Sequence, residues 1–293
     1  MERTILTGDG PESTLTITGA HVEVDHLTIS HTGDGPAVTG EAVFTDCLRI
    51  QNGETSPLES EPVPYLPTWW VCGDSTSAIC TPEWAPQTNW TQILPQYLQG
   101  RVHLQSYAKS GSSTKSFVAE GRLGAIELCL RPGDKLFMQF SHNDEKAPRE
   151  LGTDARLTFP RYLDMYIDAA RSHGAEPVIM TPFERRILDD AGNLTWSHRD
   201  YPKAARDLAM ERGVRLLDME IASRELFIST GLEEAKKYFM WLPANDPRYP
   251  NYPNGSQDNT HFIYEGAVAL AELFRKLWNS SEEQRCSQDK LLF

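Results

Sequence analysis

The chain has 293 residues, of which 40% are hydrophobic, and this is enough for one large domain or for a domain with a small appendage. No apolar run approaches the roughly 20 residues of a membrane-spanning helix. The formal net charge of −13 argues against nucleic acid and anionic membranes as partners, because both attract positively charged surfaces.

The start of the chain and its cysteines bear on location and on metal binding. Met1-Glu2-Arg3-Thr4 lacks the basic and apolar regions of a signal peptide. The sequence as written therefore predicts a cytoplasmic protein, or a secreted or cell-surface one if a leader has been removed. The five cysteines show neither a disulfide pattern nor a metal-ligand spacing, so no metal or other cofactor is predicted. Cys47, Cys72 and Cys129 lie among apolar residues, and we expect them to be buried.

Residues 1–52 differ from the rest of the chain by their content of Thr, Val, Gly and Asp. Short alternating runs at residues 14–18, 21–30 and 42–50 are separated by turn signals and predict a small β-rich segment, of the kind that stacked coils produce. So short a segment makes a poor independent core. We expect it to pack against the main domain or against another subunit. The second arrangement would give a homo-oligomer. Residues 53–66 are rich in Ser, Glu and Pro and predict a linker.

Strand and helix patterns alternate over residues 67–279, and a C-terminal tail of residues 280–293 follows. Such alternation implies an α/β fold with a parallel sheet covered by helices on both faces. The sheet is expected to be doubly wound, with ligands bound at the carboxyl ends of its strands. The strands are predicted at residues 68–72, 102–107, 135–140, 177–181 and 215–217. The main helices are predicted at residues 159–170, 202–212 and 264–278.

Gly73-Asp74-Ser75-Thr76 directly follows the first of these strands. A serine hydroxyl becomes a good nucleophile only when a neighbouring base takes its proton, and the end of a strand is where such a site would form. Gly-Asp-Ser is also ordinary turn chemistry, so the motif depends on partners elsewhere in the chain.

A candidate base lies in Asp258-Asn259-Thr260-His261, which we expect to form a loop just before the last helix. Asp258 could accept a hydrogen bond from the His261 ring, which would fix its tautomer and stabilise the imidazolium formed during attack. The alternative is that Asp258 only forms a turn and that His261 is a bystander.

Two further segments could supply donors to an oxyanion. Gly111, after the second strand, lets a backbone N–H point into the site, although a flexible serine loop is an equally good interpretation. Asn143, after the third strand, carries a neutral amide donor, although it could equally be a helix cap. His142 could be a second base, but a packed or hydrogen-bonded histidine is the better interpretation.

With these four segments in this order, the chain resembles the SGNH (GDSL-type) hydrolase superfamily over about residues 67–279. The resemblance implies a flavodoxin-like three-layer α/β/α fold with a five-stranded parallel sheet. It also implies a serine hydrolase that needs neither a metal nor a cofactor.

The resemblance implies a role for each matching residue. Ser75 would be the nucleophile, His261 the general base and Asp258 the residue that orients His261. The Ser75 N–H, the Gly111 N–H and the Asn143 side chain would form the oxyanion hole.

Within the superfamily, the chain is most similar to rhamnogalacturonan acetylesterases, which remove acetyl groups from galacturonate units of pectin. It departs from their pattern at Ser141, where glycine is usual, and at Ser106, where asparagine is common, but neither change removes a reacting group. The N-terminal runs resemble coils of a pectin methylesterase β-helix without its catalytic part, so no second activity is inferred. The similar strings lie at residues 73–76, 112–117, 120–123, 137–144, 181–186 and 258–262.

An acidic protein that binds a polyanion such as pectin needs a local cluster of cations, and arginine can grip a carboxylate with two hydrogen bonds. Each candidate alone is better explained as solvated surface charge. The loop from Trp241 to Gln257 is a candidate cleft wall or lid. The candidate substrate-binding residues are Lys115, Arg122, Arg185, Arg186 and Arg248. The candidate sugar-stacking residues, of which one or two are expected in the cleft, are Trp84, Trp90, Trp196, Trp241 and Tyr249.

The leading hypothesis is a serine esterase that deacetylates an acidic, rhamnogalacturonan-type polysaccharide or oligosaccharide through an acetyl-enzyme. One alternative is a lipase or thioesterase of the same fold, although no apolar stretch is obviously suited to an acyl tail. Another is a carbohydrate-binding protein without catalysis, in which Ser75 would be inert.

Overall fold

The computed structural model divides into two compact units, residues 1–65 and residues 66–293. In the second unit it describes residues 66–146 and 151–291. In the first unit it describes the strands alone, at residues 4–9, 15–16, 22–25, 27–32, 38–39, 42–45, 48–51 and 54–57.

The first unit is built from short strands that pair mainly in parallel. Its largest sheet has the order β1-β4-β7-β8, and only β7 and β8 are antiparallel. In two further parallel pairs, β2 with β5 and β3 with β6, each strand again pairs with the strand three places later in the chain, as β1 does with β4. Successive coils of a β-helix pair in this way. The strands are β1 Thr4–Asp9, β2 Leu15–Thr16, β3 Val22–Asp25, β4 Leu27–Thr32, β5 Val38–Thr39, β6 Ala42–Thr45, β7 Leu48–Gln51 and β8 Glu54–Pro57.

The second unit contains a five-stranded parallel sheet with the order β10-β9-β11-β12-β13. The chain enters at β9, steps to one side for β10, and then crosses back to build β11, β12 and β13, which is a doubly wound order. The strands are β9 Thr68–Gly73, β10 His103–Ser106, β11 Lys135–Gln139, β12 Glu176–Met180 and β13 Arg215–Leu217.

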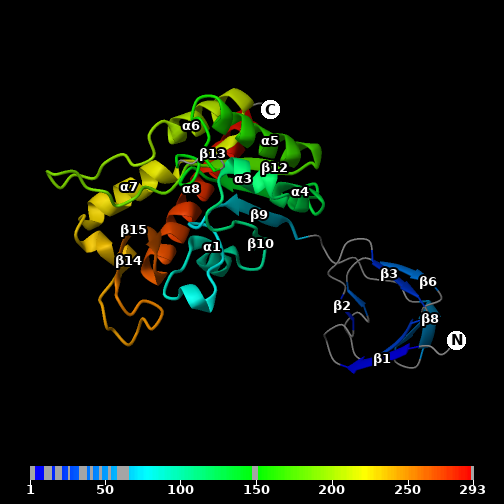
Figure 1. Ribbon diagram of the computed structural model, residues 1–293. Coiled ribbons are helices and arrows are strands. Elements are labelled where there is room, and N and C mark those ends of the chain that lie inside the picture. Colours follow the sequence, from blue (N-terminus) through cyan, green and yellow to red (C-terminus); the bar gives the residue numbers. More distant parts are fainter. Residues whose placement is uncertain are drawn as a thin grey trace. The chain divides into compact units, whose positions relative to one another are not determined.

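Helices cover both faces of this sheet (Figure 1). Side chains alternate between the faces along each strand, and in β9 Trp70 and Cys72 enter one core while Trp69 and Val71 enter the other. The helices on the first face are α3 Thr114–Ala119, α4 Arg122–Glu127, α5 Thr158–Ser172 and α6 Tyr201–Arg212. Those on the second are α1 Trp90–Ile93, α7 Met219–Thr230 and α8 Tyr264–Leu291, and the short helices are η1 Pro82–Trp84, α2 Pro95–Leu98 and η2 Glu234–Tyr238. The predicted three-layer α/β/α fold is confirmed.

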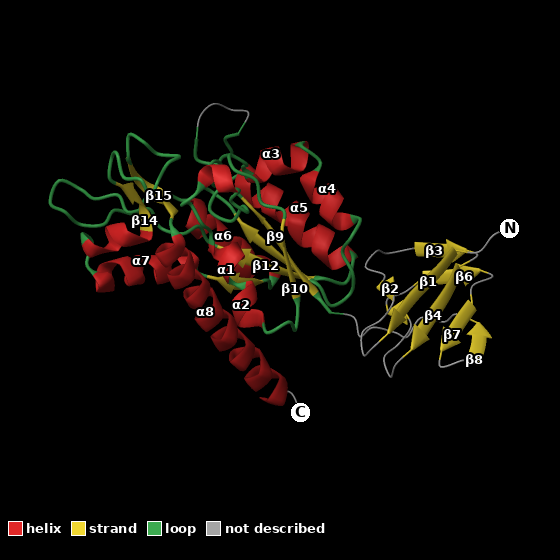
Figure 2. Ribbon diagram, turned by 90° about the horizontal axis from the view of Figure 1, so that it is seen from below, coloured by secondary structure: helices red, strands yellow, loops and turns green. Residues whose placement is uncertain are grey.

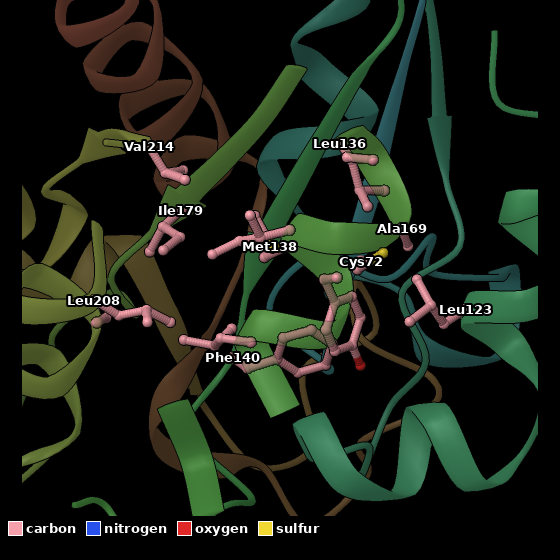
Figure 3. Close-up of a cluster of buried hydrophobic side chains, with 14 of the residues drawn as sticks. Cys72, Leu123, Leu136, Met138, Phe140, Ala169, Ile179, Leu208 and Val214 are labelled. Atoms are coloured by element: carbon pink, nitrogen blue, oxygen red, sulfur yellow. The ribbon is translucent and has the colours of Figure 1, made fainter. Parts of the chain in front are cut away.

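The first core shows why these segments form layers. In α5 the apolar residues recur at helical spacing, and Phe159, Leu163, Tyr166 and Ile167 are buried against the sheet. Figure 3 shows Leu136, Met138 and Phe140 of the central strand region among side chains of the covering helices.

Four local expectations are wrong. Residues Asp258 to His261 lie in strand β15 Ser256–Phe262, which pairs antiparallel with β14 Phe239–Leu242, and not in a loop. Helix α8 continues through the expected tail to Leu291 (Figure 2). Strand β8 occupies the start of the expected linker. Cys129 is exposed while Cys72 is buried, and Cys47 lies outside the described residues. None of the helices described is long and apolar enough to cross a membrane.

Candidate active site

Three side chains from distant parts of the sequence meet at the carboxyl edge of the sheet. The His261 Nε2 atom lies 2.9 Å from the Ser75 Oγ atom, although 186 residues separate them in the chain. The His261 Nδ1 atom lies 2.6 Å from Oδ2 of Asp258. Strand β15 carries both residues, so the antiparallel ribbon β14–β15 brings the candidate base to the candidate nucleophile.

The ionisation state of Asp258 decides which ring nitrogen of His261 carries the proton. Burial alone would raise the pKa of the Asp258 carboxyl, but hydrogen bonds from the His261 ring and from the backbone N–H groups of His261 and Thr260 lower the pKa below its usual value. An ionised carboxylate only accepts hydrogen bonds, so Nδ1 of His261 carries the proton. Its Nε2 atom is then free to accept the proton of the Ser75 hydroxyl.

The turn that carries Ser75 is held tightly. A Cβ atom on Gly73 would lie 2.8 Å from the Gln139 carbonyl oxygen, so only glycine fits there without a shift. The buried Asn89 amide donates to the carbonyl oxygens of Ser75, at 2.8 Å, and of Ala78, at 2.7 Å. The sequence did not single out Asn89, whose only local signal is its place before helix α1.

The loops after β10 and β11 lie against this turn. The Lys109 N–H donates to the Gly73 carbonyl at 3.1 Å, and Gly111 has a φ of +82°. The Asn143 amide nitrogen donates to the Ser112 carbonyl at 2.9 Å, while its oxygen accepts from Lys146 Nζ at 2.8 Å. These two bonds fix which end of the Asn143 amide is the donor.

The sequence model of the GDSL-like Lipase/Acylhydrolase family matches residues 71–268, a range that contains the whole triad and both candidate donors. The chain belongs to the GDSL-like lipase/acylhydrolase family. The predicted superfamily and the predicted class, a carboxylic ester hydrolase, are thereby confirmed.

Named relatives of this GDSL-like hydrolase come from Bacillus subtilis strain 168. The chain is 41% identical to "Rhamnogalacturonan acetylesterase RhgT" over 203 residues, which cover 69% of this chain and 85% of RhgT. It is 35% identical to "Probable rhamnogalacturonan acetylesterase YesY" over 205 residues, which cover 70% of this chain and 85% of YesY.

Solved structures share the fold of the hydrolase at lower identity. YxiM from Bacillus subtilis superposes with a TM-score of 0.63 at 24% identity, covering 78% of this chain and 60% of YxiM. A catalytic mutant of Axe2, an acetylxylan esterase from Geobacillus stearothermophilus, superposes with a TM-score of 0.52 at 15% identity, covering 72% of this chain and 93% of Axe2.

A buried pair links the nucleophile turn of the hydrolase to the loop of Asn143. Oδ2 of Asp74 lies 3.2 Å from His142 Nδ1, and Oδ1 accepts from the Thr76 N–H and hydroxyl, each at 2.9 Å. Burial opposes ionisation of Asp74, but the His142 and Thr76 contacts outweigh it and lower the pKa of Asp74. Burial lowers the pKa of His142 to about 4, against the attraction of Asp74. His142 is therefore neutral near pH 7 and packed, as the second interpretation predicted.

The loop that carries Asn143 bears on two predictions, the departure at Ser141 and the substrate contact of Arg185. Ser141 has a φ of +124°, a conformation that favours glycine, which is why a serine here is a departure. Its hydroxyl lies 3.3 Å from Nδ1 of the buried His198. The expected substrate contact of Arg185 is not supported, because its guanidinium is bound to Glu145 at 2.7 Å and to the His142 carbonyl at 3.2 Å.

The other cations predicted to bind substrate in the GDSL-like hydrolase lie in different environments. Arg186 is 3% exposed and binds Leu232, Glu233 and Asn259, so it braces the ribbon instead of facing a substrate. Arg122 packs its guanidinium over the Phe117 ring at 5.6 Å, at the helical layer. Neither position supports the expected substrate contact. Lys115 lines a surface pocket together with Asp144, Glu145 and Lys146.

Of the remaining candidates, Trp90 is fully buried and stacks on Phe274, so the expectation of a sugar contact is wrong for it. Arg248 pairs with Asp246 in the exposed turn between β14 and β15. The segment between Trp241 and Gln257 begins and ends as paired strand, with turns only in its middle. Trp84 and Trp196 are exposed, while Trp241 and Tyr249 are half-buried.

Proposed function

We propose that this GDSL-like hydrolase is a serine acetylesterase acting on an acidic, rhamnogalacturonan-type pectic polysaccharide. The observation that carries the chemistry is the continuous chain of contacts from Ser75 through His261 to Asp258. The substrate rests on the name of the relative that is 41% identical over 85% of its length.

Attack begins when His261 accepts the Ser75 proton at Nε2. The Ser75 oxygen then bonds to the acetyl carbonyl carbon, and Asp258 stabilises the imidazolium through its bond to Nδ1. Collapse of the tetrahedral intermediate breaks the bond between the acetyl carbon and the sugar oxygen, which takes the proton from His261 and leaves as a hydroxyl, and an acetyl-enzyme remains. Water activated by His261 then releases acetate and restores the serine.

The negative oxygen formed in both steps needs donors. An amide carries two N–H bonds, and Asn143 uses one on Ser112, which leaves one for the oxyanion. The N–H groups of Ser75 and Gly111 are the other two proposed donors. Loss of one such donor typically slows the reaction by about 10²–10³-fold.

Acetate release tests the proposal directly. The unmodified protein is expected to release acetate from acetylated rhamnogalacturonan faster than from acetylated xylan, with a simple aryl acetate as the activity control. Ser75→Ala should lower turnover by about 10⁶-fold, because the nucleophile and its base act as a unit. Ser229→Ala, an exposed serine on α7, is the matched control and should keep full activity.

The outcomes separate the candidate functions. Preference for long-chain esters would favour a lipase or thioesterase. Binding of the polymer with no turnover of any ester would favour a non-catalytic carbohydrate-binding protein. Full activity of Ser75→Ala would exclude the proposed mechanism.

A further inference from the structure

The nucleophile turn, residues 74–78, is a single helical turn that leads out of strand β9. The N–H groups of Ser77 and Ala78 both donate to the Asp74 carbonyl, at 3.1 and 3.0 Å. Residues 79–80 are not helical, so the carbonyl groups of this turn lack the N–H donors that a following helical turn would supply. Their donors come from another segment of the chain.

The side chain of Asn89, the residue before helix α1, supplies donors to two of these carbonyls. Its Nδ2 atom donates to the carbonyl oxygens of Ser75, at 2.8 Å, and of Ala78, at 2.7 Å. A weaker contact joins the same nitrogen to the Cys80 Sγ atom at 3.4 Å. Asn89 is 0% exposed, so these hydrogen bonds form without competition from bulk water.

The peptide unit that follows Ser75 is held at both of its polar ends. Asn89 holds the carbonyl oxygen, while the N–H of this unit belongs to Thr76 and donates to Oδ1 of Asp74 at 2.9 Å. These bonds fix the backbone from which the Ser75 side chain projects. The Ser75 Oγ atom lies 2.9 Å from Nε2 of His261, and the Ser75 N–H proposed as an oxyanion donor belongs to the same turn.

A second buried donor from α1 contacts the same turn further from the nucleophile. The Thr91 hydroxyl donates to the Ser77 carbonyl at 3.0 Å, and the Ser106 hydroxyl donates to the same oxygen at 2.7 Å. Thr91 is 2% exposed and therefore matches Asn89 in burial. The two side chains differ in their target, because only Asn89 binds the carbonyl of Ser75 itself.

We infer that Asn89 is a positioning residue for the nucleophile, which holds the Ser75 hydroxyl in reach of His261 by binding the carbonyls of Ser75 and Ala78. An amide is suited to this role because it carries two N–H bonds, whereas a hydroxyl has one donor and an ionised carboxylate has none. The inference rests on the proposed function and adds to it a residue outside the triad and the oxyanion hole. Because the side chain is fully buried, its loss should affect the chemical steps and not substrate binding.

The test compares Asn89→Ala with Thr91→Val on an aryl acetate. In Asn89→Ala, kcat is expected to fall about 10–100-fold while KM changes by less than about twofold, because misplacement of a reacting group slows the chemical step. Labelling of Ser75 by a fluorophosphonate should slow by a similar factor, since it uses the same hydroxyl and no sugar contact. Thr91→Val is the matched control, and its kcat and labelling rate should stay within about twofold of the unmodified protein. Both variants lose a donor to the turn, so both should unfold at lower urea concentration.

A second variant decides the matter if Asn89→Ala does not fold. Asn89→Ser keeps a residue that favours the start of a helix, but its one O–H can serve only one of the two carbonyls, so kcat should fall in the same direction. Normal kcat and normal labelling in a folded Asn89 variant would overturn the inference while leaving the proposed function standing. An equal loss of kcat in Thr91→Val would also overturn it, because the effect would then not depend on the Ser75 carbonyl. If the unmodified protein neither hydrolysed the aryl acetate nor was labelled at Ser75, the proposed function would fail, and this inference with it.

Discussion

A single buried imidazole connects the nucleophile turn to the loop of the proposed oxyanion donor. His142 precedes Asn143 in the chain, and its ring contacts Asp74, the residue before Ser75. The ring is 3% exposed and lies edge-on to the His198 ring, with centroids 4.6 Å apart. Burial disfavours a charged ring by more than the neighbouring Asp74 favours it, so the neutral form belongs to the folded state.

The pH dependence of stability tests this assignment. The pKa of His142 is about 4 in the folded protein against 6.5 for an ordinary histidine, so the unfolded chain binds more protons between these values. Its contribution to the free energy of unfolding is therefore fully present above about pH 6.5 and is lost as pH falls toward 4. The full change would be on the order of 3 kcal/mol.

The variant His142→Asn keeps a polar side chain beside Asp74 but does not titrate. Urea unfolding of both proteins from pH 4 to pH 7 should show the advantage of the unmodified protein growing as pH rises. A constant difference, or one that shrinks with rising pH, would mean that His142 is not held neutral.

At the scale of elements, the ribbon β14–β15 positions the proposed base, His261, and Arg186 anchors the ribbon. The Arg186 N–H donates to the Asn259 carbonyl at 3.0 Å, and its Nη1 atom donates to the Asn259 side-chain oxygen at 3.1 Å. Trp241 of β14 donates to the same side-chain oxygen at 2.8 Å. Asn259 lies between Asp258 and His261, so these bonds fix the strand that carries both.

Arg186→Leu should therefore lower kcat for an aryl acetate about tenfold or more with little change in KM, because small misplacement of a catalytic group is costly. The free energy of unfolding should fall by about 1–3 kcal/mol, since the part-buried Leu232 carbonyl and Asn259 side-chain oxygen each lose a charged donor. Arg248→Leu removes an exposed arginine from the turn of the same ribbon and should change neither quantity. Normal kcat in a folded Arg186→Leu protein would show that the ribbon positions His261 without this anchor.

Much of the second unit could be predicted from the sequence at the scale of the whole molecule. The buried strands read as short apolar runs, and the order of Gly73-Asp74-Ser75, Gly111, Asn143 and Asp258 to His261 identified the superfamily. The ribbon was missed because β15 is mostly polar and its partner β14 lies across a long connection.

The cations could not be sorted from the sequence. In the sequence Arg185 and Arg186 look like surface charges. In the structure they form ion pairs with Glu145 and Glu233, which come from distant segments of the chain. Lys146 and Arg199 carried no motif, and only the fold brings them to one surface pocket with Lys115. Self-association through the paired strands of the first unit stays a prediction.

Covalent labelling by a fluorophosphonate probe, followed by mass spectrometry of the peptides, tests the central claim most directly, because such a probe reacts quickly only with an activated serine. The account predicts one modified residue, Ser75, and labelling that is about 10²–10⁴-fold slower in His261→Ala. Attachment to a different serine, or equally fast labelling without the histidine, would contradict it.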